Sequence, residues 1–230
     1  GKDLLNDKSI ETLHSWSIID DQQLLFTGMK YMLIEDTVVQ AFPRPHSCVY
    51  YLINHLVKAN DTKIIPELWK NVFEEYCFNE NYLYQQDVNK RAKISLNNLG
   101  FYVFQYLLNT KVAADTIISL LTPNFVRMWV NRMNKRSKNK IESVIAMDQA
   151  FKTWIETNSK ELSSDTKLGL IKKLFGPNGN RRFTFKNNLS LFIFIAADIT
   201  EDGINDYITY ARKIFKTPNL KEFYPEEEND

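Results

Sequence analysis

The residues with the clearest chemical potential in this sequence are basic side chains gathered in two clusters. Between Asp115 and Glu142 the chain carries six basic residues and no acidic one. A second group of lysines and arginines flanks a Gly-Pro-Asn-Gly turn at residues 176–179. Side chains gathered in this way bind nucleic-acid phosphates without distinguishing base sequence. The predicted nucleic-acid-binding residues are Arg127, Arg132, Lys135, Arg136, Lys138, Lys140, Arg181 and Arg182.

These clusters also fit a simpler interpretation. Each could be ordinary solvated surface, and the two form one basic ridge only if their loops lie on the same edge of the fold. Two aromatic residues, Trp129 and Phe183, lie among the charges. Their helical or strand-like neighbours favour a place in the core over a role in stacking on bases.

Catalytic and metal chemistry have less support. The sequence contains no phosphate-binding GxGxxG or GK[ST] motif, and its histidines and cysteines lack the spacing of metal ligands. Adjacent acidic residues such as Glu74 and Glu75 are expected to lie on solvated helix faces. We therefore expect no catalytic residue, no metal site and no cofactor. The enzymatic alternative is a nucleotidyl-transfer enzyme that relies on Asp202 and Asp206.

Composition limits the class of protein. The chain has 230 residues, of which 44% are hydrophobic, so it can bury a core. Its formal net charge is +1, which creates no long-range field and restricts any contact with nucleic acid to a local patch. The longest apolar stretch, 191–197, is far shorter than the roughly 20 residues that cross a membrane.

The elements that would position the basic clusters are helices. Apolar residues recur every three to four positions through most of the chain, whereas only 182–186 alternates like a strand. Proline is expected in the first turn of two helices, at Pro66 and at Pro123, the second following a capping Thr122. The helices that bear on the argument are predicted at 88–109, 116–121, 123–133, 141–157 and 165–175.

Helix pairs of roughly 35–47 residues can be laid along the chain, as in armadillo and HEAT repeats. We therefore predict an all-α fold, an armadillo/HEAT-like helical-repeat stack (an α-solenoid). It forms a single domain over residues 1–220, followed by an acidic tail at 221–230.

Five short motifs occur in an order that resembles a known family. They are Pro43-Arg44-Pro45-His46, Pro66-Glu67-Leu68-Trp69 running on to Cys77-Phe78-Asn79-Glu80, Leu99-Gly100-Phe101, the set Asn124, Arg127 and Asn131, and Leu174-Phe175-Gly176-Pro177-Asn178-Gly179. Together they resemble the DNA polymerase V / Myb-binding protein 1A family, also called DNA polymerase phi. The resemblance covers about residues 42–186, and the family's members are much longer, so this chain would be an internal portion or a reduced member.

The resemblance implies a nucleolar protein of helical repeats that acts in ribosomal RNA gene transcription, ribosomal RNA processing and ribosome assembly. It carries over no catalytic residue. The implied partners are ribosomal RNA or ribosomal DNA and ribosome assembly or transcription factors, with no membrane, and the oligomeric state stays open. The alternative is a protein–protein interaction module, such as a transcription co-regulator, with no direct contact to nucleic acid.

Overall fold

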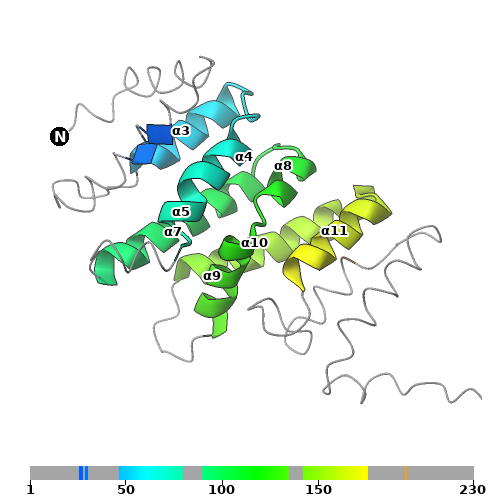
Figure 1. The fold of residues 1–230 in the computed structure, drawn as a ribbon. Helices are drawn as coiled ribbons and strands as arrows, with labels where there is room; N and C mark the ends of the chain where they lie inside the picture. The colour runs from blue at the N-terminus through cyan, green and yellow to red at the C-terminus, as the bar shows by residue number, and fades with distance from the viewer. Residues whose placement is uncertain are drawn as a thin grey trace, which may run out of the picture.

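All the regular secondary structure in the described part of the chain is helical (Figure 1). A computed structural model describes residues 26, 27, 29, 30, 47–79, 90–134, 142–175 and 195. No strand occurs among them, which confirms the predicted all-α class; the strand-like segment 182–186 lies outside these residues. The elements are α3 (Ser47–Lys58), α4 (Ile65–Leu68), η2 (Trp69–Phe73), α5 (Glu74–Tyr76), α7 (Lys90–Leu108), α8 (Ala114–Ser119), α9 (Pro123–Asn134), α10 (Glu142–Asn158), η3 (Ser159–Glu161) and α11 (Ser164–Leu174).

Local signals explain several helix ends. Pro66 lies in the first turn of α4, as predicted. Thr122 holds the residue position just before α9, where its carbonyl accepts a 3.0 Å hydrogen bond from the Val126 N–H. Helix α11 begins after Ser163, whose hydroxyl accepts from the Thr166 N–H at 3.2 Å. It ends where Phe175 turns to extended backbone, immediately before the Gly176 of the predicted turn.

The segment from α4 to α5 is one continuous helix with a π-helical turn in its middle. In this turn, η2, the N–H of Glu74 donates to the carbonyl of Trp69, five residues back. The wider turn carries Trp69, Val72 and Phe73 into the interior, where all three are buried. Such turns are rare and are often found where particular side chains must be positioned. Here the turn directs Trp69 into the core.

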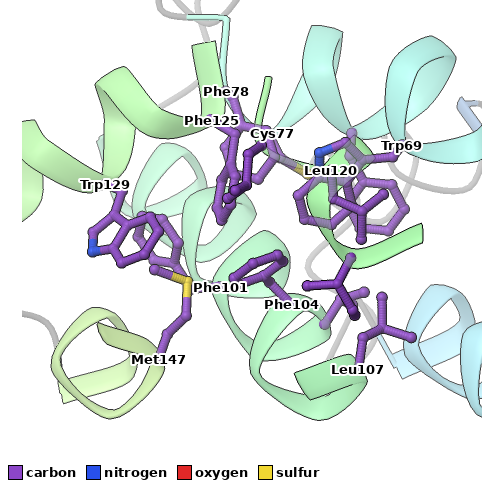
Figure 2. Packing of buried hydrophobic residues seen from close by; sticks show 14 of the residues in the cluster. Trp69, Cys77, Phe78, Phe101, Phe104, Leu107, Leu120, Phe125, Trp129 and Met147 are labelled. Carbon is purple, nitrogen blue, oxygen red and sulfur yellow. The ribbon is translucent and has the colours of Figure 1, made fainter. Parts of the chain in front are cut away.

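Aromatic rings form the centre of that core (Figure 2). Trp69 stacks on Phe73 with ring centroids 5.0 Å apart and meets Phe125 edge-on at 5.1 Å. Phe104 continues the cluster towards Trp129 and lies 4.9 Å from Phe125. Trp129 is fully buried, which confirms that it belongs to the core rather than to a base-stacking surface. These contacts join helices that are far apart in sequence, and each favourable ring pair contributes about 0.5–1.5 kcal/mol beyond area burial.

Helix α7 lies at the middle of the described structure, because it packs against both α3 and α10. Two contacts fix its register with α10. The Ser143 hydroxyl donates to Asn98 Oδ1 at 2.9 Å, across 45 residues of sequence, and the rings of Phe104 and Phe151 lie 6.1 Å apart. From the first contact to the second, the residue number rises on both helices, so α7 and α10 run in the same direction. Helix α9 contacts α10 and α11, and α4 contacts α8.

Candidate nucleic-acid interface

Helix α9 presents the first of the predicted phosphate-binding residues to solvent. Its apolar stripe, which includes Phe125, Val126 and Trp129, is buried. Arg127 lies on the opposite side and is exposed. Because the guanidinium of Arg127 is exposed to solvent, a phosphate can contact it directly.

Arg132, one and a half turns later, is directed towards the protein. Its side chain is half-buried, and Nη2 donates a hydrogen bond to Asn97 Oδ1 on α7. Asn97 is fully buried, and its Nδ2 in turn donates to the backbone carbonyl of Cys77. One amide therefore joins α9, α7 and the end of α5. Arg132 has a structural role in this junction, whatever it adds to the binding of phosphates.

Glu74, the first residue of α5, lies against the N-terminus of α9. Its carboxylate accepts hydrogen bonds from the hydroxyl of Thr122 and from the backbone and side-chain N–H groups of Asn124. Burial raises the pKa of the Glu74 carboxyl, while these hydrogen bonds and the charge of Arg127 act in the opposite direction. The carboxylate thus satisfies helix N–H groups that would otherwise lack a partner.

The expectation that Glu74 and Glu75 are both solvated is wrong for Glu74, because the N-terminus of α9 covers its carboxylate. It holds better for Glu75, which is half-exposed and forms a 3.1 Å ion pair with Lys30. The consequence for Arg127 is electrostatic. A nearby carboxylate offsets part of its positive charge, so it is a weaker phosphate ligand than an isolated arginine.

Helix α11 leads to the second basic cluster. Its Lys172 is exposed, whereas Lys173 Nζ donates a 2.9 Å hydrogen bond to the carbonyl of Ile118, near the end of α8. Burial lowers the pKa of Lys173. The ammonium satisfies a helix-end carbonyl and connects α11 to α8, so its charge serves the fold.

The two helices that precede the basic clusters are neighbours. Helix α11 packs against α9, and the C-terminal ends of both lie at the lower side of Figure 1. The basic segments continue from these ends. The predicted binding residues that lie outside the described residues are Lys135, Arg136, Lys138, Lys140, Arg181 and Arg182.

The polar contacts within this site could not be predicted from the sequence. Asn97 and Glu74 find their partners 35 and 48 residues away, respectively, and no local pattern indicates such pairs. One signal was available on α10, where Asp148 falls on the apolar stripe. It is buried, accepts from Trp129 Nε1 at 3.0 Å, and forms a 2.9 Å ion pair with Lys152.

The described residues also bear on metal binding, membrane insertion and thiol reactivity. Among them, no three histidine, cysteine or acidic side chains gather as metal ligands. No helix in the described ranges has the length and apolar character needed to cross a membrane. Cys77 is a buried free thiol, and burial raises its pKa, which makes the reactive thiolate scarce.

The comparison with protein families decides the relationship of this chain. A family model described as DNA polymerase phi matches residues 35–230. The chain belongs to the DNA polymerase phi family. The match extends beyond residues 42–186, on which the resemblance rested, and membership of this family points to a nuclear protein. The comparisons with curated proteins and with solved structures gave no match.

Proposed function

We propose that this chain is a non-enzymatic helical scaffold of the nucleolus that takes part in ribosome biogenesis and ribosomal RNA gene transcription. It binds the phosphates of ribosomal RNA or ribosomal DNA through its basic segments, and assembly or transcription factors through its helical faces. The observation that carries the proposal is the packing of α9 against α11, because a basic segment follows each of these helices. Membership of the DNA polymerase phi family supports the nuclear setting.

The scaffold is a stack of helical repeats in this proposal. Helices α7 and α10 run in the same direction, and 45 residues separate the hydrogen-bonded Asn98 and Ser143. Equivalent helices of successive armadillo or HEAT repeats are about 40–47 residues apart. Helix α3 packs on the other side of α7 and would belong to the preceding repeat. On this basis residues 1–220 form one stack, and 221–230 form an acidic tail.

The structure suggests an order of importance among the basic residues. Arg127 faces the Glu74 carboxylate, and Arg132 is engaged with Asn97. Both therefore have less unopposed charge to offer than a basic side chain without such partners. We expect Lys135, Arg136, Lys138 and Lys140 to contribute most of the binding, with Arg181 and Arg182 extending the surface.

The test is the salt dependence of binding to labelled structured RNA and to duplex DNA. Each phosphate contact with duplex DNA contributes about 0.9 to the slope of log affinity against log salt concentration. Replacing Lys135, Arg136, Lys138 and Lys140 by glutamine should flatten that slope for duplex DNA by about 3.6 units. The matched control replaces the exposed lysines Lys63, Lys70, Lys111 and Lys160, which changes the net charge equally.

Three results would count against parts of the proposal. Equal slopes for the two quadruple variants would show that binding follows net charge rather than the predicted surface. A flat response of the unmodified chain, together with salt-sensitive retention of acidic proteins, would favour the protein–protein interaction module. Primer extension that is lost in Asp202→Asn and Asp206→Asn variants would overturn the non-enzymatic assignment.

A further inference from the structure

One buried side chain connects the end of α9 to two other elements. Asn97, on α7, is fully buried. Its Oδ1 accepts a hydrogen bond from Nη2 of Arg132, and its Nδ2 donates to the backbone carbonyl of Cys77. Asparagine carries a donor and an acceptor on one short side chain, and both are used here. We call Asn97, Arg132 and the Cys77 carbonyl the amide junction.

The amide junction lies at the end of α9 from which the basic segment 135–140 continues. Arg132 is in the last turn of α9, and Lys135 follows three residues later. The last turn of a helix has carbonyl groups without partners inside the helix, so it frays more readily than the middle. Val130 is buried, whereas residues 131–133 are only partly buried. The hydrogen bond from Arg132 is therefore one of the contacts that hold this last turn against α7.

We propose that Asn97 is a positioning residue for nucleic-acid binding: through Arg132 it fixes the end of α9 from which the basic segment continues. The inference rests on the proposed function, because it concerns the same basic segment. A segment that starts from a fixed helix end has less conformational freedom to lose when it binds phosphates. Asn97 is itself buried, so it acts on binding through Arg132 and not by contact with a phosphate.

Removing the amide of Asn97 separates positioning from direct binding, because the two roles predict different results. If Arg132 were only a phosphate ligand, Asn97→Ala would release its guanidinium and leave binding unchanged or stronger. If Asn97 positions the basic segment, the same variant weakens binding although no positive charge is lost. The expected loss is about tenfold, since roughly one further residue must be ordered on binding. The slope of log affinity against log salt concentration should stay that of the parent, because the phosphate contacts are the same.

The experiment titrates the full chain and its variants with labelled duplex DNA over a salt series. Asn97→Ala should bind about tenfold more weakly at every salt concentration. Asn97→Asp keeps an oxygen that accepts from Arg132, and it should restore most of the affinity. The control is Leu56→Ala, which removes a fully buried side chain from α3, a helix outside the amide junction, and it should bind like the parent.

Two further measurements address the junction directly. Arg132→Gln should also weaken binding with the slope of the parent, whereas loss of a phosphate ligand lowers the slope by about 0.9. Hydrogen exchange of the free proteins reports on the last turn of α9 without any nucleic acid. Exchange there should be faster in Asn97→Ala than in Leu56→Ala. Equal circular dichroism spectra of all variants exclude unfolding as the cause.

The outcomes that overturn this inference differ from those that overturn the proposed function. Asn97→Ala that binds as well as the parent, or a loss of binding that Leu56→Ala shares, would show that Asn97 serves stability alone. A slope lowered by about 0.9 in Arg132→Gln would make Arg132 a phosphate ligand instead. In each of these cases the parent still binds, so the proposed function stands. A parent chain that binds no nucleic acid would overturn both.

Discussion

Replacing Gly100 with alanine should destabilise this protein, although the same replacement stabilises most helices. Gly100 is buried on α7 beneath the ring of Phe78. A Cβ atom added there would lie 2.6 Å from Cε1 and 3.4 Å from Cε2 of that ring, and closer still to Cζ. Non-bonded carbon atoms are most favourable at about 3.5–4.0 Å. The ring must therefore move by roughly 1 Å to admit the methyl group.

The magnitude follows from what holds the ring in place. Phe78 lies 4.8 Å from Phe125 and 5.3 Å from Trp69, measured between ring centroids, so its movement disturbs the aromatic core. Overpacking of this kind costs about 1–3 kcal/mol, and the helix preference of alanine over glycine offsets about 1 kcal/mol of it. We expect a net loss of about 1 kcal/mol, which lowers the Tm by about 2–4 °C in a chain of this size.

Gly169 offers a matched control for Gly100. It lies within α11, and no atom lies within 4 Å of a Cβ added there. Gly169→Ala should raise the free energy of unfolding by up to about 1 kcal/mol. Urea unfolding of both variants measures the two signs directly. A Gly100→Ala variant that is as stable as the parent would refute the packing argument. Adding Phe78→Leu to Gly100→Ala should give a loss smaller than the sum of the single losses.

Three further predictions concern the polar contacts. Asn97→Ala should lower the free energy of unfolding by about 2–4 kcal/mol, since it leaves the Cys77 carbonyl and Arg132 without this partner. Urea unfolding measures the loss, with Asn109→Ala at an exposed position after α7 as the control. Burial raises the folded-state pKa of Glu74 above its usual 4.5, so the folded protein holds this proton more tightly than the unfolded chain does. The stability of the parent relative to Glu74→Gln should therefore decrease as the pH rises from 4 to 7. A stability difference that does not change with pH would contradict the burial of the carboxyl. Lys173→Met should cost about 1 kcal/mol by removing the hydrogen bond to Ile118, whereas Lys172→Met at the exposed neighbouring position should change thermal unfolding little.

The helices themselves were largely predictable from sequence. A predicted helix at 141–157 corresponds to α10, Glu142–Asn158, because its apolar spacing is regular and its ends are polar. The π-helical turn at Trp69–Phe73 was not predictable, since it forms where the tryptophan packs among distant rings. In sequence Arg127 and Arg132 are equivalent basic residues of one helix. Only the fold distinguishes them, by bringing Asn97 to Arg132 and Glu74 to Arg127.

Three of the motifs that resemble the family contribute to the aromatic core. Trp69 and Gly100 belong to two of them, Phe125 directly follows Asn124 of a third, and Phe78 contacts all three residues. Residues in such a core restrict one another's size and shape, so they specify the packing of helices and not a ligand. We therefore expect binding to depend on residues outside this aromatic core, chiefly the basic segments that follow α9 and α11.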